Sequence, residues 1–209
     1  MNAASRMHDL FGPGSNPSGR IVRDYAQLKK IVEACRQLGM RLVLTSGTFD
    51  IKHIGHDRYL ETARSHGDLL IVGVDSDDKV KKRKGPDRPI VDEAERTESL
   101  CHVRHVDVVF VKEVKDEKWQ LIGTVHPDIL IVTAGKYGPD EIAELERNHC
   151  GKVVILEPQA TTSTTARIRK VLVGPTQEIR SKLREAFEQA DLFLSSVSGD
   201  GESKRHGGT

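Results

Sequence analysis

The fold of this chain is decided by the stretch Thr45-Ser46-Gly47-Thr48-Phe49-Asp50-Ile51-Lys52-His53-Ile54-Gly55-His56. The stretch follows a short apolar run at 41–44 and precedes a helical pattern at 57–66, so it joins a strand to a helix. At such a junction, backbone N–H groups at the helix N-terminus can hold a phosphate. Gly47 permits a tight turn that approaches a ligand closely, and Gly55 keeps side-chain bulk away from two neighbouring imidazoles.

His53 and His56 are the candidate catalytic histidines of this stretch, because their spacing puts them on one face once the helix has started. Two imidazoles there could donate hydrogen bonds to triphosphate oxygens, where charge moves during phosphoryl or nucleotidyl transfer. Taken singly, a histidine on a helix is usually a surface or core residue, and a glycine after a strand is usually a turn. The combination with its strand–helix context is more specific, and it favours a functional site.

The same residues carry a family resemblance. Gly47-Thr48-Phe49-Asp50 followed by His53-Ile54-Gly55-His56 resembles the signature of the cytidylyltransferase-like nucleotidyltransferases. Within that superfamily, the sequence most resembles the adenylyltransferase domain of ADP-heptose synthase, which joins ATP to a heptose 1-phosphate. It is also similar to glycerol-3-phosphate and choline-phosphate cytidylyltransferases and to archaeal FAD synthetases. The likeness covers about 20–173, which is most of the chain.

Apolar runs that alternate with helical patterns predict an α/β fold: a Rossmann-like, doubly wound parallel sheet of five strands with flanking helices. The runs are near-continuous, as expected of strands buried on both faces. Ligands bind such sheets beyond the carboxyl ends of the strands, where the opening stretch, Asp75 and Thr133 fall. The expected strands are 41–45, 69–74, 106–111, 129–132 and 153–156, and the expected helices are 24–38, 57–66, 92–102, 115–125 and 139–148.

The predicted domain organisation is one nucleotidyltransferase domain at 20–174 between polar ends. A stretch rich in Gly, Pro, Ser and Asn at 1–19 reads as a disordered arm. After Pro175, an amphipathic helix is expected at 175–194, and it either packs back on the domain or joins a partner subunit. The polar, Gly-rich segment 195–209 is expected to be a disordered tail.

Composition narrows the partners. Thirty-two basic and 31 acidic side chains nearly balance, which does not suggest bulk binding to nucleic acid or a membrane. No apolar run is long enough to span a bilayer, no secretory signal pattern opens the chain, and the three cysteines are scattered without metal-ligand spacing. We therefore expect a cytoplasmic protein, with small-molecule substrates, no nucleic-acid or membrane partner, no metal ligands of its own and a homodimeric assembly.

A basic run at 79–84 carries five positive charges in six residues just past the second strand. Such runs are often solvated loops or nucleic-acid patches. A nucleic-acid patch normally comes with a basic domain and stacking aromatics, but aromatic residues make up only 4% here. We favour a loop that folds over a polyphosphate and an acceptor phosphate. The resemblance supports this, because Lys84-Gly85 matches the Lys-Gly of the related transferases, whose lysine contacts phosphates.

Two further segments resemble nucleotide-contacting parts of the family. Asp92 is a plausible helix N-cap with Glu95 three residues on, and the resemblance makes Arg96 a nucleotide contact rather than a surface helical arginine. Hydroxyl side chains at 161–165 could simply cap a helix, but five in a row after the last strand suggest a second anion site. The core of that run matches the Ser-Thr-Thr that binds nucleotide phosphate in the heptose and glycerol enzymes: Ser163, Thr164 and Thr165.

The chain departs from the related enzymes at two places. Pro158 stands where cytidylyltransferases have an arginine, which the heptose enzymes also lack, so the change argues for ATP over CTP. The segment 133–137 aligns with Lys-Gly-Gly-Asp-Tyr of the heptose enzymes, so Lys136 replaces an acid and Thr133 replaces a lysine. These exchanges leave the nucleotide site intact, but they mean that the acceptor can differ from that of the heptose enzymes.

The resemblance implies nucleotidyl transfer, in which an oxygen of a sugar 1-phosphate attacks the α-phosphorus of an NTP and pyrophosphate leaves. ATP is the expected substrate, its Mg²⁺ is carried by the phosphates, and base recognition is expected from backbone groups around 133–137. The expected catalytic residues are His53, His56 and Lys84; the nucleotide-binding residues are Gly47, Thr48, Phe49, Gly55, Arg96, Thr133, Gly135, Tyr137, Ser163, Thr164 and Thr165; the acceptor-binding residues are Asp50, Asp75 and Lys136.

Other functions remain open at this point. A cytidylyltransferase that acts on glycerol 3-phosphate or another polyol phosphate would use the same motifs, as would an adenylyltransferase of the FAD-synthetase type. A module that senses nucleotide without turnover is the non-enzymatic alternative. The retained histidines, Lys84 and the Ser-Thr-Thr run favour an enzyme.

Overall fold

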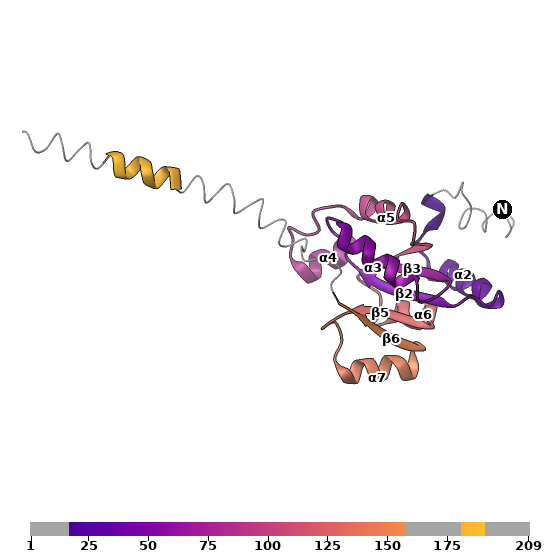
Figure 1. Ribbon diagram of the computed structural model, residues 1–209. Helices are drawn as coiled ribbons and strands as arrows, with labels where there is room; N and C mark the ends of the chain where they lie inside the picture. Colours follow the sequence, from indigo (N-terminus) through magenta and orange to yellow (C-terminus); the bar gives the residue numbers. More distant parts are fainter. Residues whose placement is uncertain (1–16, 158–180, 191–209) are drawn as a thin grey trace, which may run out of the picture. The chain divides into compact units, whose positions relative to one another are not determined.

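The computed structural model describes residues 17–157 and 181–190. In the first range, strands form one parallel sheet in the order β1-β4-β3-β2-β5-β6 (Figure 1). The predicted doubly wound α/β class is therefore confirmed. The strands are β1 (Ile21–Val22), β2 (Leu42–Gly47), β3 (Leu69–Asp75), β4 (Val108–Lys112), β5 (Ile129–Thr133) and β6 (Lys152–Leu156).

Helices cover both faces of the sheet (Figure 1). Side chains of α2, α6 and α7 share one buried apolar cluster with the sheet, and side chains of α3 and α5 share the other. The strands are buried on both sides as a result, which explains why their sequences read as continuous apolar runs. The helices are η1 (Pro17–Arg20, 3₁₀), α2 (Tyr25–Gln37), α3 (Ile54–Arg64), α4 (Asp77–Lys84), α5 (Glu93–Cys101), α6 (Gln120–Val125) and α7 (Pro139–Asn148).

The strand order reverses at the centre of the sheet. The chain runs from β2 outwards to β3 and β4, and then returns to place β5 on the opposite side of β2. The crevice beyond the carboxyl ends of β2 and β5 is therefore the topological switch point, where open α/β sheets bind ligands. Gly47 ends β2 and Thr133 ends β5, so both border this crevice.

The expectation of five strands was wrong by one. The sixth, β1, has only two residues and pairs with β4, so it is too short to show a period. Residues 17–19 were assigned to the disordered arm, but with Arg20 they form η1. Arg20 anchors this turn, since its guanidinium donates hydrogen bonds to the carbonyl oxygens of Val106 and Cys101.

A second correction concerns the basic run, which is the helix α4 and not a loop. Ser76 caps its start by accepting a hydrogen bond from the N–H of Lys79 at 3.3 Å, and two aspartates follow in the first turn. The lysines and the arginine fill the last turn, where positive charge complements the helix dipole. Gly85 ends the helix with a positive φ of 98°. The helix expected at 115–125 is also shorter, since α6 starts only at Gln120.

The chain divides into two compact units, 1–161 and 162–209. In the second unit the structure describes an exposed helix at 181–190, inside the helix expected at 175–194. The expected tail at 195–209, most of the arm at 1–19 and the run at 161–165 lie outside the described residues. None of the helices among the described residues is long and apolar enough to cross a membrane.

Candidate active site

The two histidines meet at the start of α3. His53 is the N-cap, and its Nδ1 accepts a hydrogen bond from the N–H of Gly55 at 3.1 Å. His56 reaches back in turn, and its Nδ1 accepts a hydrogen bond from the N–H of His53 at 3.2 Å. The ring centroids are 4.2 Å apart. The helix start therefore holds both imidazoles side by side, as the spacing predicted.

These bonds also decide where the ring protons lie. A neutral imidazole has one N–H, and each Nδ1 here is already an acceptor, so the proton belongs on Nε2. Desolvation and the charge of His53 lower the pKa of His56 to about 4, so His56 is neutral at pH 7. Its Nε2–H is left as a donor of fixed direction. Such a donor suits an oxyanion at the positive end of a helix.

The loop before α3 is tightly constrained. Glycine suits position 47 because a Cβ there would lie 3.0 Å from the ring of Phe49, which would then have to give way. Phe49 and Ile51 have positive φ angles of 53° and 46°, a region that non-glycine residues rarely occupy. Phe49 is buried, and its ring packs edge-on against His56 with centroids 5.7 Å apart. The loop conformation thus helps to orient the second histidine.

Asp50 sits between those two strained residues and is buried. Its carboxylate forms an ion pair with Arg88 at 2.7 Å and accepts the backbone N–H groups of Ile90 and Val91 at 3.1 and 3.0 Å. The sequence assigned Asp50 to the acceptor. These contacts connect the loop to the segment before α5, so Asp50 is a positioning residue in this structure, and its contact with the acceptor stays a prediction.

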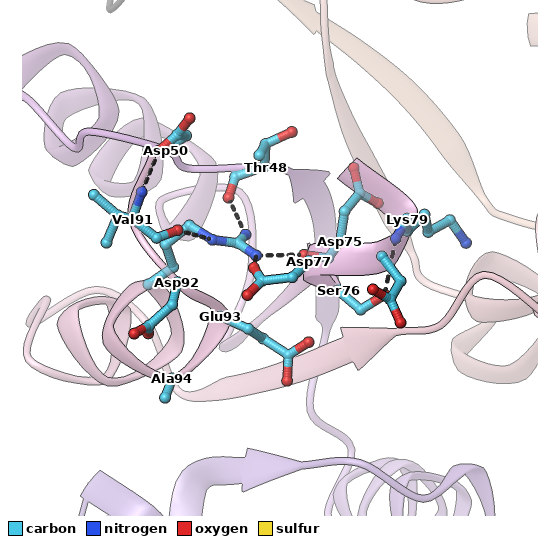
Figure 2. Close-up of polar contacts among 12 residues, drawn as sticks. Thr48, Asp50, Asp75, Ser76, Asp77, Lys79, Val91, Asp92, Glu93 and Ala94 are labelled. Carbon is cyan, nitrogen blue, oxygen red and sulfur yellow. Dashed lines mark hydrogen bonds and ion pairs between the residues drawn. The ribbon is translucent and has the colours of Figure 1, made fainter. Parts of the chain in front are cut away.

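Arg96 is the largest of the fully buried side chains, with 1% of the residue exposed. Its guanidinium donates to the carbonyl oxygens of Thr48 at 2.6 Å and Asp75 at 2.9 Å, and to the carboxylate of Asp77 at 2.7 Å. Its Nε donates to the carbonyl oxygen of Val91 at 2.9 Å. Figure 2 shows these groups converging from the β2 loop, the end of β3, the start of α4 and the segment before α5. Arg96 is thus a buried clasp in this structure, and its contact with the nucleotide stays a prediction.

Asp92 is the N-cap of α5, as predicted, and accepts the N–H of Glu95 at 2.8 Å. This cap starts the helix that carries Arg96, so it helps to direct the guanidinium inwards. The alternative considered for Arg96, an exposed helical arginine, is wrong, because the residue is buried.

The last turn of α4 connects the histidine loop with the next strand. Arg83 donates to the hydroxyl of Thr48 at 2.7 Å and pairs with Asp75 at 2.8 Å. Lys84 follows it, and desolvation together with the charges of Arg83 and Arg88 lowers its pKa. The carboxylates of Asp50 and Asp75 act in the opposite direction. Lys84 therefore lies among the charges of both segments and keeps an exposed position.

A pocket of about 500 Å³ opens beyond the carboxyl ends of β2, β3 and β4. Buried Asp75 lies in its wall, paired with Lys112 at 2.8 Å as well as with Arg83. Desolvation acts to raise the pKa of Asp75, but Lys112, Arg83 and Lys79 outweigh it and keep the pKa below its usual value. Asp75 is therefore a negative charge among cations in the wall of the pocket.

Lys136 and Tyr137 form another wall of this pocket. The ammonium of Lys136 donates to the carbonyl oxygen of Ser46 at 3.1 Å. Although the residue as a whole is exposed, desolvation of the ammonium and repulsion by Lys112 lower its pKa to about 8. The ring of Tyr137 lies edge-on to Trp119, with centroids 6.3 Å apart.

The predicted residues thus fall into two groups around the switch point. The histidine loop and the pocket meet at β2, where Ser46 and Gly47 line the pocket. Thr133 and Gly135 border the crevice after β5, and Ser163, Thr164 and Thr165 lie outside the described residues. The sequence analysis missed Lys112, Trp119 and the role of Arg88. A basic residue at a strand end was the available signal for Lys112, whereas Trp119 reaches the wall from a short turn without a recognisable pattern.

A doubly wound sheet with a helix N-terminus at its switch point is the arrangement typical of nucleotide-binding α/β proteins. Comparison with known proteins identifies which kind. Residues 44–171 match the family described as cytidylyltransferase-like, which is more than half of the chain. The chain belongs to the cytidylyltransferase-like family and is a nucleotidyltransferase, as the motif predicted.

Curated relatives agree with this assignment. The chain is 38% identical over 159 residues to the bifunctional protein HldE of Geotalea uraniireducens, in an alignment that covers 75% of this chain and 32% of that protein. It is 42% identical over 147 residues to the bifunctional protein HldE of Actinobacillus pleuropneumoniae serotype 5b, which covers 69% and 30% of the two chains. The chain thus spans about a third of the length of these relatives.

A solved structure is also similar. It is described as the lipopolysaccharide core biosynthesis protein of Thermoplasma volcanium, with a TM-score of 0.50 and 28% sequence identity. The match covers 56% of this chain and 96% of that chain.

Proposed function

We propose that this chain transfers a nucleotidyl group from an NTP to a sugar 1-phosphate and so forms a nucleotide-activated sugar. A phosphate oxygen of the acceptor forms a bond to the α-phosphorus, and the bond from that phosphorus to the oxygen bridging to the β-phosphate breaks. That oxygen leaves with the pyrophosphate and keeps the electron pair. The acceptor phosphate is already an anion, so the attack needs no general base.

The observation that carries the proposal is the pair of imidazoles at the start of α3. Both Nδ1 atoms accept backbone N–H groups, so the proton of each neutral ring lies on Nε2, the atom that we propose as the donor to phosphate oxygens. Donors fixed before the reaction stabilise charge on the departing pyrophosphate without reorganisation. Within the described residues this pair lies at the switch point of the sheet, where a nucleotide is expected.

Lys84 would neutralise the phosphates that react. Its depressed pKa and its place at the end of a fixed helix suit a cation that meets several negative oxygens at once. The described residues contain no group of three ligating side chains that could hold a metal ion. In the proposal, Mg²⁺ is carried by the phosphates of the NTP, where it would supply charge neutralisation. Thr133 and Gly135, together with Ser163, Thr164 and Thr165, remain proposed contacts of the nucleotide, whereas Tyr137 lines the pocket beside Lys136.

ATP is the proposed nucleotide and a heptose 1-phosphate the first acceptor to test, because relatives that share 38% and 42% of the aligned residues are HldE proteins. A homodimer in the cytoplasm remains part of the proposal. The test incubates the pure chain with Mg²⁺, ATP or CTP, and a panel that includes heptose 1-phosphate and glycerol 3-phosphate. Pyrophosphate release that requires both an NTP and an acceptor is expected.

The same assay separates the alternatives. Preference for CTP with glycerol 3-phosphate would replace the proposal with a cytidylyltransferase of polyol phosphates. Tight nucleotide binding without pyrophosphate from any acceptor would refute nucleotidyl transfer and favour a sensing module. A matched control uses His66→Ala, whose histidine lies beyond the end of α3 and away from the imidazole pair.

A further inference from the structure

The pocket beyond β2, β3 and β4 carries more positive charge than its own carboxylates can balance. Twice as many basic as acidic side chains line it. The basic side chains are Lys79, Lys82, Arg83, Lys112, Lys118 and Lys136, and the acidic ones are Asp75, Asp116 and Glu117. Because the basic side chains repel one another, a bound anion would stabilise the pocket and is its expected occupant.

Most of these charges already have partners within the protein. Arg83 and Lys112 share the carboxylate of Asp75, and Lys118 pairs with Glu141 outside the lining. Asp116 accepts the hydroxyl of Tyr25 at 2.9 Å and is engaged on the pocket floor. Lys136 and Lys79 differ from these: within 17–157 each ammonium is hydrogen-bonded to a carbonyl oxygen, of Ser46 and Glu113 respectively, and forms no ion pair.

The cost of this arrangement is visible in the electrostatics. Desolvation and Lys112 lower the pKa of Lys136 to about 8, and the same two causes lower the pKa of Lys79. Both ammonium groups are therefore less stable as cations, first because they are desolvated and second because Lys112 repels them, and the nearby carboxylates do not fully compensate. An anion bound between them would remove the repulsion and gain charge-assisted hydrogen bonds.

The anion that would pair with Lys136 is a different group from the phosphate that reacts. His53, His56 and Lys84 are the groups expected around the α-phosphorus, and none of them lines the pocket. The edge-on pair of Trp119 and Tyr137 supplies an apolar wall beside the lysine. Aromatic walls with a few placed polar groups are typical of sites for small molecules. The pocket thus offers room for a ring and a charge beyond the reacting phosphate.

We propose that the acceptor is a phosphorylated sugar acid, whose carboxylate binds Lys136 and whose ring lies against Trp119 and Tyr137. This inference rests on the proposed function and names the acceptor class of the same site. Ordinary sugar phosphates would fill the pocket but leave Lys136 without its partner. Because a charge-assisted hydrogen bond is involved, the acid should bind about tenfold more tightly or better than its neutral counterpart.

The test compares matched pairs: glucuronic acid 1-phosphate with glucose 1-phosphate, and galacturonic acid 1-phosphate with galactose 1-phosphate. Calorimetry measures binding to the full chain without NTP, and pyrophosphate release measures turnover with ATP or CTP. The expected result is a preference of about tenfold or more for the acid in at least one pair. Lys136→Met should abolish the preference and Lys136→Arg should retain it. Lys81→Met is the control, because Lys81 is exposed, pairs with Asp78 and lies outside the pocket lining.

The outcomes distinguish this inference from the proposed function. Equal or undetectable binding of both members of each pair overturns the acid-binding assignment, whatever the turnover. An acid preference that survives Lys136→Met also overturns it. Pyrophosphate from neutral sugar phosphates with no acid preference would leave nucleotidyl transfer standing and refute only the acceptor class. Acid binding that depends on Lys136, without pyrophosphate from any NTP, would refute nucleotidyl transfer and keep the acid site.

Discussion

Replacing His56 by asparagine separates the two tasks that the structure gives this residue. An asparagine Oδ1 occupies the place of Nδ1 and can still accept the N–H of His53, but nothing remains at the position of Nε2. Alanine removes both groups. We therefore expect His56→Asn to keep the free energy of unfolding within about 0.5 kcal/mol of the original, whereas His56→Ala should lose about 1 kcal/mol with the lost cap.

Turnover should not follow stability, because it should fall in both variants. A donor aimed at charge that develops in the transition state contributes about 3 kcal/mol, or at least about a hundredfold in rate. Both variants should lose that factor in kcat, and His56→Gln, whose amide nitrogen can reach the Nε2 position, should recover part of it. His53→Asn is expected to behave similarly, and the double variant should lose less than the sum because both rings act on one set of oxygens.

Pyrophosphate release under saturating NTP gives kcat, and urea unfolding of the same preparations gives stability. His66→Ala is the control and should stay within about twofold of the original rate. Near-normal turnover of a stable His56→Asn variant would refute the reasoning, because the donor on Nε2 would then have no catalytic weight. A large stability loss in the same variant would refute the assigned cap.

Three further predictions follow from the site. Lys84→Ala should lower kcat on the order of a hundredfold with little change in NTP binding, while Lys81→Ala should have a small effect on kcat. Equal losses in the two variants would mean that the basic residues at 79–84 act only through their summed positive charge. Arg96→Met should lower the free energy of unfolding by about 3 kcal/mol in urea titrations, because buried carbonyl oxygens and Asp77 lose their hydrogen-bond donor. The control Arg147→Met, on the exposed face of α7, should change the free energy of unfolding by less than about 0.5 kcal/mol. Because the pKa of His56 is depressed, the unfolded chain binds more protons than the folded chain between pH 6.5 and about 4. The free energy of unfolding should therefore fall by about 1–2 kcal/mol as the pH drops through this window, after allowance for solvent screening. His56→Asn should lack this component.

The histidine site could be predicted because its information is local. A glycine turn, an N-cap position and a spacing of three residues together determine how two rings meet, and all lie within one strand–helix junction. The basic run was misread although its signals were also local. Ser76 followed by two aspartates indicates a helix start, but the prediction was based on the density of lysines and not on these capping residues.

The buried clasp could not be predicted, since its partners come from distant parts of the chain. Arg96 reaches Thr48, Asp75 and Asp77, and only folding of the sheet brings these groups together. An arginine on a helix with charged neighbours looks exposed, yet Arg96 belongs to the buried face of α5. Burial of Arg96 is a property of topology, whereas the caps are properties of sequence.

The helical state of α4 changes how Lys84 can act. A loop would have to become ordered when substrate binds, and each residue fixed at that moment would cost binding free energy. Here Ser76 caps the helix, Arg96 holds Asp77 at its start, and Arg83 fixes its last turn to Asp75 and Thr48. Lys84 is therefore held at a defined distance from the histidine loop before any substrate arrives. Its contribution belongs to preorganisation, which raises kcat without tightening the binding of NTP alone.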